Sequence, residues 1–546
     1  MLQKYLTIIL LFVFLVPLYS QSSEDELLVP TDQYLTDFIK GDTLSDGSRN
    51  LNRVYVLQRG ATYYLNYSFS NPYPLRFTAE KGSEAKPIIT LAQGEDGKFP
   101  KFMFFQDEYM SFKNIVIDGI PASDPSWCAN SIVFVDEAGY DLEVDSCLFT
   151  NVYGQYIRTQ SPLRKLKVTN STFGNSGFVP IGVMGIGKGI DFRGSSCDTA
   201  IFRNNTWVNL ADRVIRHRGS SASIKYFEFD HNTMVQNMSY SGVFELGQVG
   251  EKVVVTNNLL YNVFTYGRDL NDTSRAEEFS GYGTYEVEVN GAPKQVILNA
   301  AVFDTTQGAA PNDTTLFIVK NNYLNYSQEL TDWWAANGLL EPHFMLDSLK
   351  RKLDDPSIAF IKDTQLSVNN IPGVPITLMD RYREDFQRVG ITDGTDYDRK
   401  SLDYYLSEFD CTYPTTNDAY SGADGGFPVG DLNWFPNKKD EWQDWITDVD
   451  QDNTVNTIPT EYSLDQNYPN PFNPSTVINF SIPSAGLTTL KVYNILGQEV
   501  ATLVNKELTA GAYQFEFNAN NLSSGVYFYK LQSKDYSEVR KMMLMK

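Results

Sequence analysis

The chain has 546 residues, enough for one elongated domain and a smaller one. It contains 45 Lys and Arg against 67 Asp and Glu, so its net charge is −22 at pH 7. This charge excludes nucleic acid as a partner of the whole chain, because phosphate binding needs a basic surface. An acidic polymer could bind only at a local basic patch.

The first residues have the pattern of a secretory signal peptide. Lys4 precedes an apolar run from Leu6 to Pro17, and Ser20 stands before Gln21. We predict that residues 1–20 are a signal peptide and that the mature protein is exported. The apolar run is too short to span a bilayer and no later run is long enough, so we expect no transmembrane segment.

Two segments precede the regular part of the chain. Residues 21–51 are acidic and polar, which predicts a mobile lead-in. Between residues 52 and 90, short apolar runs are broken by Gly and Pro. These runs are typical of irregular first rungs that cover the open end of a coil, where backbone groups would otherwise be unpaired.

One six-residue phrase then recurs seven times with variations. Successive copies begin 24 to 34 positions apart, except for a last step of 64. A repeat of this length determines the architecture. The copies are Phe112–Ile117, Val144–Phe149, Val168–Phe173, Phe202–Trp207, Phe229–Met234, Val255–Leu260 and Val319–Leu324.

Each copy reads as the end of one strand, a turn and the start of a second strand. The third position is Asn in five of the seven copies, and Asn tolerates the left-handed conformation of a tight turn. In a coil whose rungs stack about 4.8 Å apart, these amides would form a ladder. We therefore predict an all-β fold with a right-handed parallel β-helix over residues 52–350. Leucine-rich repeats are shorter and lack this turn chemistry.

The long last step holds an insertion from Tyr266 to Asp313. Its strand-like runs, Tyr285–Val289 and Gln295–Leu298, predict one degenerate rung with a protruding loop. After the last copy, Ser327 to Asn337 reads as a helix capped by Ser327. We expect its two adjacent tryptophans to plug the far end of the coil, although such a pair can also stack on a sugar ring.

The four cysteines allow three pairings, and the sequence does not choose among them. No CxxC or Cys/His spacing indicates a metal site. We expect buried, unpaired thiols in the coil rather than disulfides. The cysteines are Cys128, Cys147, Cys197 and Cys411.

The repeat ends before an irregular region, residues 351–440, which is rich in Pro, Gly and Asp. Residues 441–461 are predicted to be a linker. The spacing of Asp448, Asp450 and Asp452 within them is similar to a calcium loop, but the Gly and Glu that such a loop needs are missing.

From residue 462 onward, short strands with regularly spaced turns predict a small β-sandwich. The motifs are Gln466-Asn-Tyr-Pro-Asn-Pro-Phe-Asn-Pro-Ser-Thr, Val492-Tyr-Asn-Ile-Leu-Gly-Gln-Glu-Val and Ser524-Gly-Val-Tyr-Phe-Tyr-Lys. Residues 462–546 thereby resemble the type A sorting domain of the type IX secretion system. The resemblance implies an immunoglobulin-like fold, contact with the type IX machinery, and export to the cell surface or beyond, with removal of this domain.

The strands that precede the repeated phrases can be aligned on four apolar residues, Ile157, Ile190, Ile215 and Phe244. If these residues point inward, alternation points their neighbours outward in one charged column. That column is Arg158, Asp191, Arg216 and Glu245, and two residues further on Gln160, Arg193 and Arg218 form a second column. His217 turns inward, which favours a buried histidine with satisfied hydrogen bonds over a proton shuttle.

The coil resembles pectate-lyase-like right-handed β-helix proteins in the texture of its repeat. That resemblance implies a polysaccharide lyase, with a cation or calcium that neutralises the uronate carboxylate and an Arg or Lys that removes the proton. Arg216 and Arg218 are the candidate catalytic residues, and Arg158 and Arg193 the candidate substrate-binding residues. Asp191 and Glu245 could hold Ca²⁺, the one cofactor that the sequence suggests.

The same column could also be only a charge ladder, in which each cross-strand pair contributes about 0.2–1 kcal/mol. Two functional classes therefore stay open. One is a secreted enzyme that contacts or cleaves extracellular polysaccharide, a lyase rather than a hydrolase. The other is a surface adhesin or glycan-binding scaffold without catalysis.

Overall fold

The structure is a computed structural model, and it divides into two compact units, Met1–Lys439 and Asp440–Lys546. It describes residues 25–177, 186–217, 222–239, 243–246, 249–263, 265–267, 284–289, 292–297, 315–342, 353–377, 379–380, 409–452, 462–467, 470–484, 486–508, 511–520, 522–534 and 536–545. The predicted signal peptide, Arg218 and most of the long insertion lie outside these residues.

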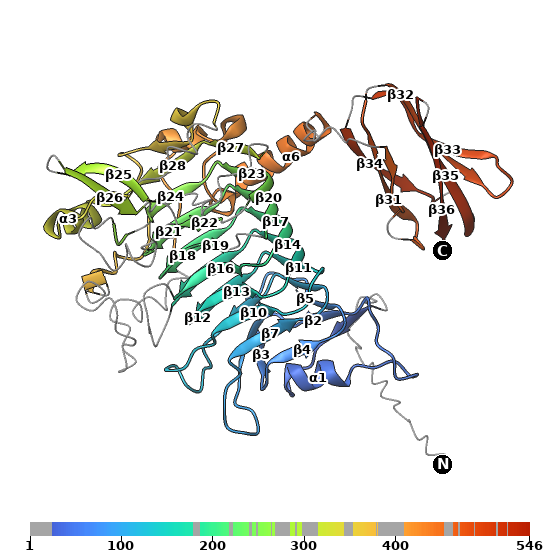
Figure 1. The fold of residues 1–546 in the computed structure, drawn as a ribbon. Helices are drawn as coiled ribbons and strands as arrows, with labels where there is room; N and C mark the ends of the chain where they lie inside the picture. The colour runs from blue at the N-terminus through green and yellow to red at the C-terminus, as the bar shows by residue number, and fades with distance from the viewer. Residues whose placement is uncertain are drawn as a thin grey trace, which may run out of the picture. The chain divides into compact units, whose positions relative to one another are not determined.

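The first unit is a parallel β-helix of three sheets, here named A, B and C, whose strands stack rung upon rung (Figure 1). Sheet A contains β1 (Glu26–Leu28), β2 (Val54–Leu57), β5 (Leu75–Ala79), β8 (Met110–Lys113), β11 (Asp141–Asp145), β14 (Leu163–Thr169), β17 (Cys197–Arg203), β20 (Ile224–Asp230), β23 (Val249–Thr256) and β27 (Leu316–Lys320). Sheet B contains β3 (Thr62–Leu65), β6 (Ile88–Leu91), β9 (Val116–Asp118), β12 (Leu148–Val152), β15 (Thr172–Ser176), β18 (Thr206–Leu210), β21 (Thr233–Asn237), β24 (Leu259–Val263), β28 (Asn322–Asn325) and β29 (Phe360–Lys362). Sheet C contains β4 (Phe69–Asn71), β7 (Phe102–Gln106), β10 (Ser131–Val135), β13 (Gln155–Thr159), β16 (Lys188–Arg193), β19 (Ile215–His217) and β22 (Phe244–Glu245).

The repeated phrase crosses from sheet A to sheet B, as predicted. Its third residue has a positive φ of 50–60° in all seven copies, including the two that are not Asn, Ser146 and His231. The turn therefore imposes the left-handed conformation, and Asn is the side chain that most often tolerates it. The other five are Asn114, Asn170, Asn204, Asn257 and Asn321.

The amide ladder lies one residue later than predicted. At the fourth position of the phrase, Asn205 donates to Asn232 at 2.9 Å and Asn258 donates to Asn322 at 2.7 Å, with a 3.3 Å link between Asn232 and Asn258. All four side chains are fully buried. At the third position Asn321 does donate to Asn257 at 3.1 Å, but Asn170 and Asn257 donate to carboxylates. The fourth position thus provides the continuous internal column.

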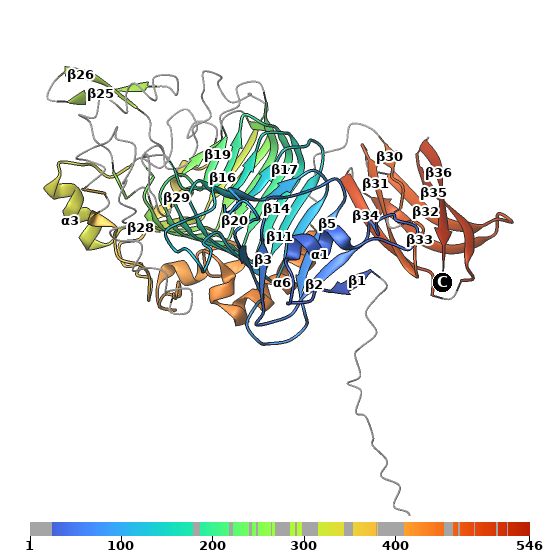
Figure 2. The same ribbon diagram turned by 90° about the horizontal axis from the view of Figure 1, so that it is seen from below.

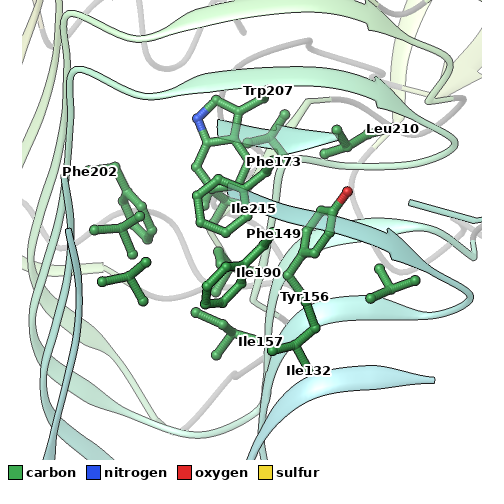
Figure 3. Close-up of a cluster of buried hydrophobic side chains, with 14 of the residues drawn as sticks. Ile132, Phe149, Tyr156, Ile157, Phe173, Ile190, Phe202, Trp207, Leu210 and Ile215 are labelled. Atoms are coloured by element: carbon green, nitrogen blue, oxygen red, sulfur yellow. The ribbon is translucent and has the colours of Figure 1, made fainter. Parts of the chain in front are cut away.

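The predicted register of sheet C is confirmed for the first column. Beyond Asp191 the register shifts and Arg193 pairs with His217, so the predicted alignment of Arg193 with Arg218 is wrong. Ile157 pairs with Ile190, Ile190 with Ile215, and Ile215 with Phe244, and all four are at most 1% exposed. Figure 3 shows these isoleucines inside the coil, next to the aromatic rings of sheet B. Burial of such stacked apolar columns is the main stabilising contribution in a coil of this kind.

The N-terminal segment is ordered, so the prediction of a mobile lead-in is wrong for much of it. Strand β1 pairs with β2, and helix α1 (Leu35–Gly41) buries Leu35 and Ile39 in the core. Figures 1 and 2 show α1 beside the first strands of the coil. We expected irregular first rungs to cover the apolar end of the coil. Instead, helix α1 covers this end and the first rungs are regular.

The far end of the coil carries the predicted helix, α3 (Gln328–Ala336). Ser327 caps it and accepts a hydrogen bond from the backbone N–H of Leu330. Trp333 and Trp334 are 7% and 3% exposed and belong to the core. Their burial supports the plug and not the sugar-stacking alternative.

The long insertion adds no rung to sheet A or sheet B, which corrects the prediction. Strand β23 pairs directly with β27, and β24 with β28, across the insertion. The two predicted strand-like runs instead form an antiparallel hairpin of β25 (Thr284–Val289) and β26 (Ala292–Ile297). The stack is therefore continuous on both sides of the insertion.

Part of the region predicted to be irregular returns along the coil. After η1 (Pro356–Ile358) and β29, the chain forms η3 (Asp418–Ser421), η4 (Asp424–Gly426) and η5 (Leu432–Trp434). We name residues 423–434 the return segment, because it follows the turns between sheets A and B backwards. The backbone N–H of Asp424 donates to Asn257 at 3.0 Å, and Asn433 donates to the backbone carbonyl of Asn204 at 2.9 Å.

All four cysteines are buried and free, as expected. Helix α6 (Pro436–Asp452) begins in the first unit and continues into the second, where it occupies the first part of the predicted linker. The strands of the second unit come after this helix. Two antiparallel sheets enclose a separate apolar core, as expected for a small β-sandwich. One contains β30 (Ser463–Leu464), β31 (Ser475–Ile482) and β34 (Gly511–Asn518), and the other β33 (Glu499–Leu508), β32 (Gly486–Asn494), β35 (Gly525–Ser533) and β36 (Tyr536–Leu544).

Candidate functional site on the outer face of sheet C

One outward column of side chains crosses all seven strands of sheet C. Its members are paired rung by rung, and the predicted charged column forms its upper part. In order, the column is Ser70, Phe105, Phe134, Arg158, Asp191, Arg216 and Glu245. It changes from aromatic to charged between Phe134 and Arg158.

The three upper charges neutralise one another. Arg216 lies 3.1 Å from the Asp191 carboxylate and 3.9 Å from that of Glu245. These side chains are only 11%, 1% and 4% exposed, respectively. Here the charge-ladder interpretation describes the geometry well, although the ladder is largely buried and not open to solvent.

Three further charged residues, missed by the alignment, complete this cluster. Asp212 lies 3.2 Å from the Lys188 ammonium and 2.9 Å from the Arg213 guanidinium. Arg213 also lies 2.9 Å from Glu245. All three are buried. The available signal was a single lysine between two glycines at the start of β16, and an Asp-Arg pair just before β19.

Burial and charge shift the pKa values in this cluster. Burial lowers the pKa of Lys188, and nearby Arg216 adds to that shift, while Asp212 opposes it. Burial alone would raise the pKa of Asp212, but Arg213 and Lys188 hold it below the usual value. The cluster therefore combines an ionised carboxylate with a lysine that loses its proton more easily than usual.

Two arginines of the predicted site do not take part in these ion pairs. Arg158 is half-buried with its guanidinium 5.7 Å from the centre of the Phe134 ring. Its Nε has no hydrogen-bond partner in the part of the chain that the structure describes. Burial lowers the pKa of Arg158, and repulsion from the nearby Arg193 lowers it further, despite attraction to Asp191.

Arg193 is exposed at the end of β16, where its φ is 54°. Its backbone N–H donates to Asp191 at 3.1 Å, which holds this left-handed turn in place. No carboxylate among the described side chains forms an ion pair with Arg158 or Arg193. The two guanidiniums therefore present positive charge on the outer face of sheet C.

His217 is structural, as predicted. Its side chain is fully buried, and its two ring nitrogens lie 2.9 Å from the Leu246 carbonyl and 3.0 Å from the Ser195 carbonyl. Burial lowers its pKa. Both nitrogens already face backbone acceptors, so the ring is not placed to exchange protons with a substrate.

The predicted calcium ligands both face cations. Asp191 contacts Arg216, and Glu245 contacts Arg213. Across the described residues, no group of three or more His, Cys, Asp and Glu side chains converges as a metal site would require. Calcium takes about six to eight oxygen ligands. These two carboxylates would have to exchange their arginines for the ion, so their present arrangement does not fit it well.

The lower rungs present aromatic rings on the same face. Phe102 lies 4.9 Å from Phe134 between ring centroids, and Phe105 lies 5.4 Å from Phe134. The Lys101 ammonium is 5.7 Å from the Phe102 ring centre. The outer face of sheet C therefore joins an aromatic surface to the two unpaired arginines.

Comparison with known proteins bears on the second unit. Residues 466–545 match the family model of the secretion system C-terminal sorting domain. This domain indicates export by the type IX secretion system to the cell surface or extracellular space, and implies contact with that machinery. No curated protein matches the chain. None of the helices that the structure describes is long and apolar enough to cross a membrane.

Proposed function

We propose that this exported protein binds acidic polysaccharide outside the cell, and that Arg158 and Arg193 receive its carboxylates. The observation that carries the proposal is the pair of adjacent guanidiniums without a carboxylate partner among the described residues. An acidic polymer needs such a local positive site, because the chain as a whole has a net charge of −22. A planar guanidinium matches a carboxylate with two parallel hydrogen bonds, so a uronate would relieve the repulsion between the two arginines.

The neighbouring residues support this role. Asp191 holds the backbone of Arg193 and the side chain of Arg216 at once, which fixes the turn that carries Arg193. Phe134 lies under Arg158 and limits the orientations of its guanidinium. The side chain of Arg158 and the backbone of Arg193 therefore lose less conformational freedom on binding than free surface groups would.

Binding can be measured directly with the complete chain. Polygalacturonate, alginate and hyaluronan serve as acidic polymers, and dextran serves as the neutral control, at low and at high salt. The Arg158→Ala/Arg193→Ala variant is expected to bind the acidic polymers at least about tenfold more weakly, since charged hydrogen bonds are lost. Added salt should weaken the wild type more than the variant.

A matched control comes from sheet A. Arg76 is also half-buried, with its guanidinium 4.8 Å from the Tyr109 ring centre. Arg76→Ala should leave the affinity for acidic polymers unchanged. The proposal is wrong if the wild type binds none of the acidic polymers, or if the double variant binds them as tightly as the wild type does.

Cleavage of the polymer by β-elimination is the second candidate function, and the lowered pKa of Lys188 favours it. A base takes the proton from the carbon beside the carboxylate. The bond to the glycosidic oxygen on the next carbon then breaks, a carbon–carbon double bond forms, and the departing oxygen takes up a proton. Lys188 suits this role better than Arg216, because its pKa is lowered whereas the free pKa of Arg is above about 12.

Lys188 is buried, and a substrate can reach its ammonium only if the surrounding chain opens. Binding is therefore the primary proposal. Ultraviolet absorbance of unsaturated uronide, with calcium and with a chelator, measures cleavage. Product from the wild type that disappears in Lys188→Gln would establish the lyase, and Arg216→Ala tests our sequence-based assignment. Calcium dependence that disappears in Asp191→Asn would support the predicted ion site. Binding without product leaves a glycan-binding scaffold.

A further inference from the structure

A pocket of about 730 Å³ opens at the edge of sheet C, on lower rungs than the two arginines. Two loops form it, residues 92–101 before β7 and residues 119–130 before β10, together with Tyr153 before β13. Its volume falls within the range of about 300–1,000 Å³ that is usual for small-molecule sites. The lining includes Lys98, Phe99, Lys101, Trp127, Asn130 and Tyr153.

The aromatic part of this pocket is a platform. The rings of Phe99 and Trp127 lie 5.2 Å apart and tilted by 39°, and both are half-buried. Tyr153 is half-buried as well and adds a hydroxyl group to the lining. Half-exposed aromatic faces beside a polar edge are suited to the apolar face of a sugar ring, whose hydroxyls then reach the polar groups.

The backbone holds the pocket in place. The N–H of Asn130 donates to the Lys101 carbonyl at 2.8 Å, and the N–H of Gly154 donates to the Asn130 carbonyl at 3.0 Å. These bonds tie three successive rungs together directly under the loops. The N–H of Tyr153 also donates to the Ala129 carbonyl at 2.8 Å. The platform therefore exists before a ligand arrives, which reduces the entropy cost of binding.

The charges in the pocket favour an acidic ligand. Lys98 and Lys101 are both exposed, and neither forms an ion pair with a described carboxylate. The acidic residue of the lining, Asp124, is occupied within its own loop, because Ser126 donates to its carboxylate from the backbone at 3.1 Å and from the hydroxyl at 2.6 Å. The two ammonium groups are therefore available to an anion.

We infer that this pocket is a separate subsite for one uronic acid unit, which stacks on Trp127 while Lys98 and Lys101 bind its carboxylate. The inference rests on the proposed function, because it assigns the pocket to the same acidic polysaccharide. It goes further in naming a second point of contact and the direction of the bound chain.

The direction follows from the surface between the two sites. Lys101 lies over Phe102, Phe102 packs on Phe134, and Phe134 lies under Arg158. This path climbs from β7 through β10 to β13, which is two rung spacings or about 10 Å. A polysaccharide that occupies both sites would therefore run along the coil axis over the aromatic surface.

Short and long ligands separate the two sites experimentally. Calorimetry would compare digalacturonic acid, long oligogalacturonides and neutral maltotriose, using the wild type, Trp127→Ala, Lys98→Met/Lys101→Met and the Arg158→Ala/Arg193→Ala variant. Tyr64→Ala and Lys81→Met are matched controls, since Tyr64 is an exposed aromatic on sheet B and Lys81 is an exposed lysine outside the pocket.

The disaccharide should bind the wild type and lose at least about tenfold in affinity in Trp127→Ala. The lysine variant should lose the preference for the acidic sugar over maltotriose. The affinity for long oligomers should fall in both pocket variants and in the arginine variant, and it should be unchanged in the two control variants. Unchanged affinities of the disaccharide and the long oligomers in both pocket variants would overturn the inference.

The failure of the proposed function gives a different pattern. In that case the Arg158→Ala/Arg193→Ala variant keeps full affinity for long oligomers. If long oligomers lose affinity in the arginine variant alone, the polysaccharide binds on sheet C without using the pocket, and only the pocket inference is wrong.

Discussion

Two columns run along this coil, and both place polar groups one rung apart. The amide column of Asn205, Asn232, Asn258 and Asn322 is fully buried and links identical neutral groups. The charged column of Arg158, Asp191, Arg216 and Glu245 lies on the outer face of sheet C, and its last three members form ion pairs. An amide both donates and accepts, so the amide column extends by repetition of one residue. A charged column must alternate in sign, and at its end, where Arg158 follows Phe134, a charge is left for a ligand.

The largest expected effect comes from interrupting the amide column. Asn232 accepts from the backbone N–H of Asn205 and donates to the Phe202 carbonyl, at 3.1 and 3.0 Å. Asn232→Ala leaves these buried groups unpaired, and should lower the free energy of unfolding by about 2–4 kcal/mol. Denaturant unfolding measures this change. Asn52→Ala is the control because Asn52 is exposed, and equal stability of the two variants would contradict a structural role for the column.

The second effect concerns Asp431, the carboxylate of the return segment that lies beside the turns between sheets A and B. Burial raises the pKa of Asp431 to about 7, although hydrogen bonds from Asn433 and Thr206 oppose the shift. The folded pKa lies above the usual 3.8, so the stability from this group is complete below pH about 4 and is lost as the pH rises through 7.

Between pH 5 and pH 8 the wild type should therefore lose about 2–3 kcal/mol of stability in the return segment. Asp431→Asn should remove most of this dependence, because it cannot ionise. Hydrogen exchange of the backbone amides near Leu432, measured at several pH values, reports the local opening. A wild type and a variant with the same pH dependence would show that Asp431 titrates normally.

The third effect compares two members of the charged column that lie two rungs apart, on either side of Asp191. Arg216→Ala leaves the buried carboxylate of Asp191 without its guanidinium, and should cost about 1–3 kcal/mol. Arg158 has no carboxylate partner among the described residues, so Arg158→Ala should cost less than about 1 kcal/mol. Thermal melts of both variants check the difference, and the reverse order would mean that the charges are not paired as described.

The smallest effect measures what the left-handed turn contributes to stability without the hydrogen bonds of the amide column. Asn114 has φ of 60°, and it has no side-chain link in the ladder. Asn114→Ala should therefore cost only the left-handed conformation, about 1 kcal/mol, and Asn114→Gly should cost less than that. Denaturant midpoints of the two variants measure this cost. If Asn114→Gly instead lowered the stability by more than this expected cost, the side chain of Asn114 would itself contribute to stability.

The sequence predicted the coil because its turn and its alternation are local properties. The turn residue must tolerate a positive φ, which explains why the third position was recognised from Asn114 and its equivalents. The ladder was misplaced because it depends on which side chain points inward after the turn. That direction depends on the path of the whole rung, as Asn205 shows with its full burial.

The candidate site was predicted in part for a similar reason. Alternation correctly assigned Arg158, Asp191 and their partners to one face of sheet C. It could not show which of them are neutralised, because Lys188 and Arg213 reach the cluster from the start of β16 and from the residues before β19. Which charges remain free is a property of the packed structure, and only the three-dimensional contacts distinguish Arg158 from Arg216.

The continuous pairing of β23 with β27 has a consequence for how such proteins diversify. More than fifty residues separate Val263 from Leu316, yet the strands on both sides pair as if they were consecutive. The entropy cost of closing a longer loop grows only with the logarithm of its length. Evolution can therefore exchange the segment at this position without altering the scaffold. The same junction is a rational place to graft a foreign peptide or domain onto the coil for surface display.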